Sequence, residues 1–149
     1  MQHRWMWRFV ESRAPQLRGS RCLDWDGWYG GSVFSSICAE VDVLVYATPF
    51  GQVDNRPLYW AAKQGSLSAR RYQADAHSMA RYLPNGVYGL VIANSVFEHL
   101  ANPWLAMRNV AALLRPGGLL FWHTPSVYEM HGVPRDYVRA TAFESETIP

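Results

Sequence analysis

A glycine-bearing turn near the start of the chain is the first place where the residue types indicate ligand chemistry. Its sequence, Asp24-Trp25-Asp26-Gly27-Trp28-Tyr29-Gly30-Gly31, follows a short apolar run. Glycines after a strand let the backbone approach a ligand closely, and the N–H groups at the start of a following helix attract polar or anionic groups. The turn therefore predicts either a site for a nucleotide-like ligand, with Asp24, Gly27 and Gly30 beside it, or a turn that binds nothing.

The second candidate is the pair Glu98-His99, which follows a strongly apolar run. Histidine changes charge near neutral pH, so His99 is a candidate general base. The alternative is a structural role for the pair.

Polar side chains also gather in the run from His131 to Thr141. His131, Arg135, Tyr137 and Arg139 carry the donors and cations that suit an anionic or polar small molecule. The alternative for one of them is a surface ion pair between Arg139 and Asp136. No metal site is expected, because His123, His131 and Asp136 lack a recognised ligand spacing.

Alternating strand and helix patterns must position these residues. Strands are predicted at 21–25, 41–46, 71–74, 87–93 and 119–123. Between the last two, Asn102 is expected to cap a helix that has Pro103 at its first position and Ala106, Val110 and Leu113 on one face. This alternation predicts a single α/β domain with a parallel sheet.

The amino-acid sequence from Tyr88 to Pro125 resembles the second half of a class I S-adenosylmethionine-dependent methyltransferase of the type 11-like group. The likeness rests on the elements Ser95–Leu100 and Leu114–Gly118, and the run His131–Thr141 is similar to an element found after the fifth strand in one variant of that family. The resemblance covers about residues 19–141. It implies a Rossmann-like, doubly wound, mostly parallel sheet with strand order 3-2-1-4-5 and helices on both faces.

The resemblance also implies roles for single residues. S-adenosylmethionine is the implied cofactor, with the Asp75 carboxylate accepting from the adenine amino group and the Ala76 N–H contacting the ring. Asn94 and Ser95 would lie beside the methionine part. The run His131–Thr141 would roof the pocket of a small-molecule acceptor. The implied cofactor contacts are Asp24, Gly27, Gly30, Asp75, Ala76, Asn94 and Ser95.

The chain departs from the family pattern at three places. Asp26 and Trp28 stand where the inner glycines of the first turn belong. The second strand ends in Tyr46-Ala47-Thr48 without the acid that binds the ribose hydroxyls, and a neutral hydroxyl binds more weakly than a carboxylate. The chain also stops before the sixth and seventh strands, so the fifth is expected to form an exposed sheet edge, covered by a protein partner or by self-association.

Composition sets further bounds. Fourteen basic and 12 acidic residues are spread along the chain, for a net charge of +2, and do not indicate a nucleic-acid partner. No apolar run approaches the roughly 20 residues of a membrane span. Cys22 and Cys38 match no known motif, so neither a disulfide framework nor an oxidising compartment is expected, and a cytoplasmic location is the default. Residues 1–18 are expected to form a helical extension before a domain at 19–149.

Two function classes follow. The first is an enzyme that passes the methyl group of S-adenosylmethionine to an oxygen, nitrogen or carbon atom of a small acceptor. The second is a non-catalytic, methyltransferase-like remnant that serves as a binding or assembly module. A nicotinamide-dependent oxidoreductase is disfavoured, because the chain has neither a regular glycine fingerprint nor the ribose acid.

Overall fold

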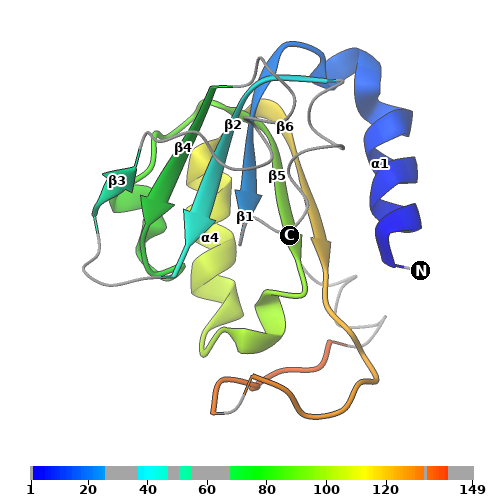
Figure 1. Cartoon of the computed structure of the whole chain (residues 1–149), viewed down its shortest axis with the longest axis vertical. Coiled ribbons are helices and arrows are strands. Elements are labelled where there is room, and N and C mark those ends of the chain that lie inside the picture. Colours follow the sequence, from blue (N-terminus) through cyan, green and yellow to red (C-terminus); the bar gives the residue numbers. More distant parts are fainter. Residues whose placement is uncertain (1, 26–36, 47–50, 55–67, 133, 141–149) are drawn as a thin grey trace.

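The computed structural model describes residues 2–25, 37–46, 51–54, 68–132 and 134–140 (Figure 1). Two α-helices, two 3₁₀-helices and six strands occur in these ranges. In chain order they are α1 (Gln2–Leu17), β1 (Ser20–Trp25), β2 (Cys38–Val45), β3 (Val53–Asp54), β4 (Ser68–Gln73), η1 (Met79–Arg81), β5 (Tyr88–Asn94), η2 (Phe97–His99), α4 (Pro103–Leu113) and β6 (Leu114–His123).

The described strands form one sheet in the order β3-β4-β2-β1-β5-β6. The five longer strands are parallel to their neighbours, and the two-residue β3 pairs antiparallel with β4 at one edge. In chain order β1, β2, β4, β5 and β6 are the five predicted strands, so the predicted order 3-2-1-4-5 is confirmed. The carboxyl ends of the parallel strands therefore lie along one edge, above the segment that follows β6 (Figure 1).

Apolar cores cover both faces of the sheet. On one face Met6, Val10 and Leu17 of α1 are buried against Leu90 and Ile92 of β5. On the other face α4 packs against the two 3₁₀-helices and against alternate residues of the central strands. The buried side of α4 consists of Ala106, Val110 and Leu113. This layering is the one predicted for a doubly wound sheet, whose central strands are apolar on nearly every residue because both faces are covered. The division of the chain at residue 18 stays a prediction.

Local signals set the ends of α4. The Asn102 side chain accepts a hydrogen bond from the Leu105 N–H at 3.0 Å, and Pro103 occupies the first turn, as predicted. The last strand is predicted to begin at residue 119, whereas β6 already begins at Leu114 and includes Pro116, Gly117 and Gly118. Its register with β5 shifts there, and a Cβ at Gly118 would lie 2.7 Å from the Tyr88 carbonyl oxygen. The glycines thus form an irregular strand start that lets β6 approach β5 closely.

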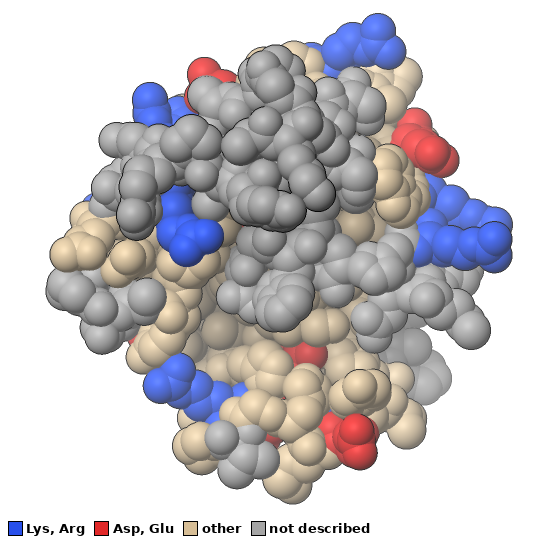
Figure 2. Space-filling view, viewed as in Figure 1, with Lys and Arg blue, Asp and Glu red and all other residues tan. Residues whose placement is uncertain are grey.

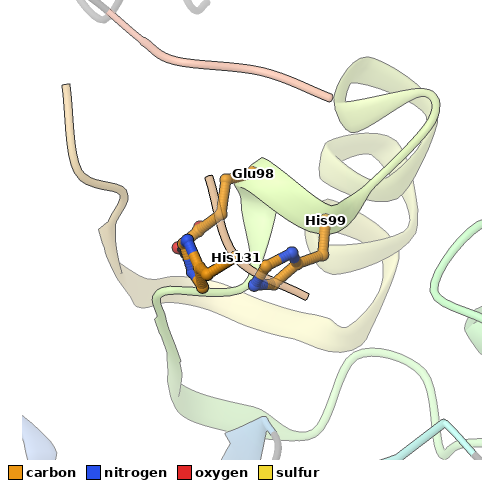
Figure 3. Close-up of side chains that lie close together, drawn as sticks. All are labelled: Glu98, His99 and His131. Atoms are coloured by element: carbon orange, nitrogen blue, oxygen red, sulfur yellow. Dashed lines mark ion pairs between the residues drawn. The ribbon is translucent and has the colours of Figure 1, made fainter. Parts of the chain in front are cut away.

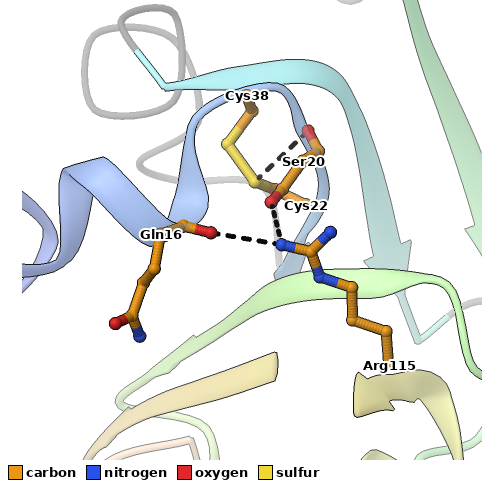
Figure 4. Close-up of a disulfide and its surroundings, with 5 residues drawn as sticks. All are labelled: Gln16, Ser20, Cys22, Cys38 and Arg115. Atoms are coloured by element: carbon orange, nitrogen blue, oxygen red, sulfur yellow. Dashed lines mark hydrogen bonds between the residues drawn. A yellow bond between two sulfur atoms is a disulfide. The ribbon is translucent and has the colours of Figure 1, made fainter. Parts of the chain in front are cut away.

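A disulfide joins Cys22 of β1 to Cys38 of β2, with 6.1 Å between their Cα atoms (Figure 4). The expectation that the two cysteines stay unpaired is therefore wrong. The cause is strand adjacency: β1 and β2 are parallel neighbours, and Ser20 pairs with Cys38, which brings Cys22 within reach two residues further along β1. The bridge lies in the apolar core beneath α1, where the Arg115 side chain donates to the Gln16 carbonyl oxygen and the Ser20 hydroxyl.

A buried polar cluster spans the middle of the sheet. The Asp42 carboxylate, almost wholly buried, accepts from the Tyr88 hydroxyl at 2.6 Å and from Nε of Arg21 at 2.8 Å. The Arg21 guanidinium also donates to the Tyr72 hydroxyl at 3.3 Å. Burial of Tyr88 and its neighbour Asp42 together raise the pKa of the Tyr88 phenol well above its usual value.

The described basic side chains form separate groups on the face drawn in Figure 2, with no continuous basic surface. None of the described helices is both long enough and apolar enough to cross a membrane.

Candidate functional site

A cavity of about 270 Å³ opens at the carboxyl ends of the parallel strands. It is slightly smaller than typical small-molecule sites, which begin at about 300 Å³. The ends of β1, β2, β4 and β5 form one side, and η2 with the segment after β6 forms the other. Its lining includes Trp25, Tyr46, Asp75, Ala76, Ser95, His99, Arg135 and Tyr137. The structure thus brings together predicted residues from three separate parts of the sequence, 75–76, 95–99 and 135–137.

Asp75 follows β4 and points one carboxylate oxygen back into its own turn. Oδ1 accepts from the backbone N–H of His77 at 2.8 Å and lies 2.6 Å from Nδ1 of the same histidine. Oδ2 makes no hydrogen bond with a described residue, and the side chain is 31% exposed. Asp75 therefore both stabilises the turn and keeps an acceptor for a ligand donor such as an adenine amino group.

Ser95 stands at the end of β5 with a backbone φ of 55°, and it is the one described residue other than glycine with a positive φ. Its N–H donates to the His123 carbonyl oxygen at 2.8 Å, which ties the unusual conformation to β6. Such conformations cost about 1–3 kcal/mol and gather at ligand sites. The preceding Asn94 is buried, and its side-chain Nδ2 donates to no described residue.

The end of β2 supplies an aromatic ring in place of a carboxylate. Tyr46 lines the cavity with 53% of its surface exposed. The guanidinium of Arg135 lies over this ring, with 4.5 Å between Cζ and the ring centroid. Among the described lining residues Asp75 has the one carboxylate, since Asp42 is held in the buried cluster with Arg21.

His99 is held at the cavity by the segment after β6. Its Nδ1 lies 2.5 Å from the Arg135 carbonyl oxygen, and the N–H of Tyr137 donates to the Glu98 carbonyl oxygen at 2.7 Å. Gly132 makes this approach feasible, because a Cβ there would lie 2.9 Å from Cε1 of His99. The segment therefore roofs the cavity and orients the imidazole.

Arg139 and His131 do not line the cavity. The Arg139 guanidinium forms a bidentate ion pair with the Asp136 carboxylate. Arg139 and the hydrogen bond from the His131 N–H hold the pKa of this carboxyl well below its usual range. This is the ion pair that the sequence left open as an alternative for Arg139. His131 instead faces Glu98, with 3.8 Å between Nε2 and Oε1.

Of the other predicted cofactor contacts, Asp24 and Asn94 are absent from the described lining. Gly27 and Gly30 fall outside the described residues. Asp24 is fully buried at the end of β1 and is not part of the described lining. The sequence left a structural role open for the pair Glu98-His99 but did not indicate how Glu98 acts. Its backbone carbonyl accepts from the N–H groups of Tyr137 and Val138, and its buried carboxylate accepts from the Thr124 hydroxyl.

Comparisons with known proteins agree with this fold. The sequence profile of the methyltransferase domain matches residues 6–145. Similar solved structures include a putative methyltransferase from Bacillus halodurans (TM-score 0.61, 19% identity) and the trans-methyltransferase CalH in complex with SAH (TM-score 0.53, 21% identity). A third is the [4+2]-cyclase SpnF (TM-score 0.57, 19% identity), so the same fold occurs in a protein named for another reaction. No curated protein matches the sequence.

The matches cover most of this chain but only part of each solved structure. The match to the Bacillus protein spans 83% of this chain and 52% of that protein. The match to CalH spans 76% of this chain and 34% of CalH, and the match to SpnF spans 78% of this chain and 43% of SpnF. At these identities the solved structures establish the fold. The profile match covers nearly the whole sequence and confirms the resemblance stated above. The chain belongs to the methyltransferase-domain family and has the class I methyltransferase fold.

Proposed function

We propose that the chain binds S-adenosylmethionine at the carboxyl ends of β1, β2, β4 and β5 and takes part in methyl transfer to a small-molecule acceptor. The observation that carries this proposal is the cavity, which joins Asp75, Ala76 and Ser95 on the strand side to His99, Arg135 and Tyr137 on the other. When bound, the cofactor supplies an electrophilic methyl group. The chain's own residues bind, orient and enclose the two reactants.

The described residues fit parts of such a cofactor. Oδ2 of Asp75 is open to accept from an amino group. Ser95 lines the cavity, and the buried Asn94 before it has a side-chain N–H donor that no described residue uses. Arg135 and Tyr137 supply a cation and a hydroxyl for a polar or anionic acceptor on the opposite side. His99 carries one nitrogen beside the Arg135 carbonyl oxygen, which fixes the ring for a role as proton acceptor.

A second candidate function is a non-catalytic binding or assembly module. It is favoured by the end of β2, where the exposed Tyr46 ring takes the place of a ribose-binding carboxylate. A hydroxyl forms weaker hydrogen bonds than an ionised acid, which lowers affinity for a ribose.

Ligand-induced thermal stabilisation separates the two candidates. S-adenosylhomocysteine should raise the melting temperature of the wild type, because a ligand that binds only the folded state stabilises it. Asp75→Asn keeps the oxygen that His77 uses but replaces Oδ2 by an amide donor, so the shift should disappear. Glu129→Gln removes a carboxylate from an exposed residue and should leave it unchanged. An equal shift in Asp75→Asn would contradict the proposed adenine contact, and no shift in the wild type favours the module.

We also propose that the β6 edge is covered by a protein partner or by a second copy of the chain. Among the described strands β6 has a neighbour, β5, on one side only. Unpaired strand edges readily add another strand. Sedimentation over a range of concentrations tests self-association, and a strictly monomeric protein would leave a different partner as the cover.

We propose a cytoplasmic location, although the Cys22–Cys38 bridge counts against it, and the redox state of this pair in cells is the test. Disulfides persist mainly in oxidising compartments. Thiol trapping in intact cells followed by mass measurement should find both cysteines reduced if the protein is cytoplasmic. A bridged pair would contradict that location.

A further inference from the structure

Three side chains that can ligate a metal ion meet where η2 contacts the segment after β6 (Figure 3). Glu98 and His99 come from η2, and His131 comes from the segment. One ligand atom of each lies within 4.8 Å of the other two. The sequence indicated no such group, because His131 lies 32 positions after His99 and the three residues share no recognised spacing.

The Glu98 carboxylate has an unfilled position in this cluster. Its side chain is fully buried, and Oε2 accepts from the Thr124 hydroxyl at 2.9 Å. Oε1 accepts no hydrogen bond from a described residue, and Nε2 of His131 is 3.8 Å away, beyond hydrogen-bond range. Because buried polar atoms are almost always paired, this oxygen points to a partner that completes the site.

The hydrogen bonds of the two imidazoles leave Nε2 of each ring free to bind a metal ion. Nδ1 of His99 lies 2.5 Å from the Arg135 carbonyl oxygen, and Nδ1 of His131 lies 3.2 Å from the Glu129 carbonyl oxygen and 3.7 Å from the Asp136 carboxylate. These neighbours only accept hydrogen bonds, so each Nδ1 carries the hydrogen. Each Nε2 then keeps its lone pair, and a carbonyl or carboxylate on the other nitrogen is the usual support of a ligating histidine.

We propose that Oε1 of Glu98 and the Nε2 atoms of His99 and His131 bind one divalent cation, and that zinc is the best-suited ion. Two histidines and one glutamate form a known three-ligand set for zinc, which leaves a fourth position open. Zinc bonds of about 2.0–2.1 Å place tetrahedral ligand atoms about 3.3 Å apart. Binding therefore draws the partly exposed rings inward towards the buried carboxylate.

A cation here links two features of the molecule. It fastens the segment 131–138 to η2, where backbone N–H groups of Tyr137 and Val138 already donate to the Glu98 carbonyl oxygen. It also borders the cavity, because His99 is part of the lining. With its Nε2 lone pair bound to the ion, His99 cannot accept a proton there, so the proton-acceptor role proposed above applies to the metal-free chain only.

The competing explanation for the cluster is a simple ion pair, in which a protonated His131 faces an ionised Glu98 and no metal binds. The two explanations differ in what the protein does with zinc alone. The test needs no S-adenosylmethionine, so its failure leaves the proposed function untouched.

The experiment is calorimetric titration of the chelator-treated, desalted full chain with zinc, followed by cobalt substitution and visible absorption spectroscopy. His131→Ala removes a partly exposed ligand. Glu98→Gln keeps an oxygen for Thr124 but removes the charge. His77→Ala is the matched control, since His77 contacts Asp75 and Asn102 outside the cluster. Circular dichroism checks that each variant is folded.

The expected result is one zinc per chain, with affinity lowered by more than about tenfold in His131→Ala and in Glu98→Gln but unchanged in His77→Ala. The cobalt form should show visible absorption bands that both ligand variants lose. Absence of zinc binding to the wild type would overturn the proposal. So would binding that both folded ligand variants retain at wild-type affinity, or binding that His77→Ala weakens equally.

Discussion

The guanidinium of Arg135 lies over the Tyr46 ring, with 4.5 Å between Cζ and the ring centroid. This contact joins the segment after β6 to the end of β2 across the cavity. The two residues are far apart in the sequence, so the contact closes a large loop over the carboxyl ends of the strands.

Removing this cation–π contact should loosen the roof of the cavity. Arg135→Ala should increase the rate of amide hydrogen exchange in residues 126–139. The increase should be a few-fold, because the lost interaction is worth about 0.5–1 kcal/mol. Arg108→Ala, which removes an exposed arginine of α4, is the control and should leave the exchange unchanged. If Arg135→Ala exchanges at the wild-type rate, the contact does not hold the segment.

The buried carboxylate of Asp42 should be essential for stability. Asp42→Ala leaves Arg21 without its closest counter-charge and Tyr88 without its acceptor, and breaking such a buried pair costs about 3–5 kcal/mol. Glu40→Ala tests the neighbouring carboxylate, which lies 3.6 Å from Nε of Arg21 and is 46% exposed. It should cost at most about 1 kcal/mol. Urea unfolding measures both, and equal losses would refute a special role for Asp42.

Stability should fall at alkaline pH because of Tyr88. Burial and Asp42 raise its folded-state pKa, so the folded state holds the phenol proton more tightly than the unfolded chain does. The resulting contribution is complete below the unfolded value of about 10 and is lost as the pH rises above it towards the raised value. In Tyr88→Phe the free energy of unfolding should decline less between about pH 9 and pH 11 than in the wild type. Tyr82→Phe, which changes a partly exposed tyrosine, should follow the wild-type curve.

The disulfide should contribute measurably to stability. Cys22 and Cys38 are 16 positions apart, and closing a loop of about 15 residues stabilises a protein by about 3 kcal/mol in the chain-entropy model. The double variant Cys22→Ser/Cys38→Ser should therefore unfold at lower urea concentration than the oxidised wild type. A reductant should lower the wild-type midpoint and leave the double variant unaffected; a reductant-insensitive wild type would contradict a structural bridge.

The fold could be predicted because its signals are local. The apolar strands and the Asn102 cap, which bonds to Leu105 three residues later, need no knowledge of distant parts of the chain. The family resemblance implied that Asp75 and Ser95 lie at one site, which agrees with the meeting of the carboxyl ends of parallel strands at one edge.

The remaining features depend on contacts between distant residues. The Cys22–Cys38 bridge requires the register of β1 against β2, which is irregular after Ser20. The path of residues 124–140 has no helix or strand period to predict it. That path is set by contacts such as the Tyr137 N–H to the Glu98 carbonyl oxygen, which also bring His131 to the buried carboxylate.

Calorimetric titration of the intact wild-type chain with S-adenosylhomocysteine tests the central claim most directly. Binding of one ligand per chain with a micromolar dissociation constant is the predicted result, because Asp75 and Ser95, which both line the cavity, are the proposed contacts to the two ends of the cofactor. No detectable binding at millimolar ligand would contradict the claim that this methyltransferase-domain chain binds S-adenosylmethionine.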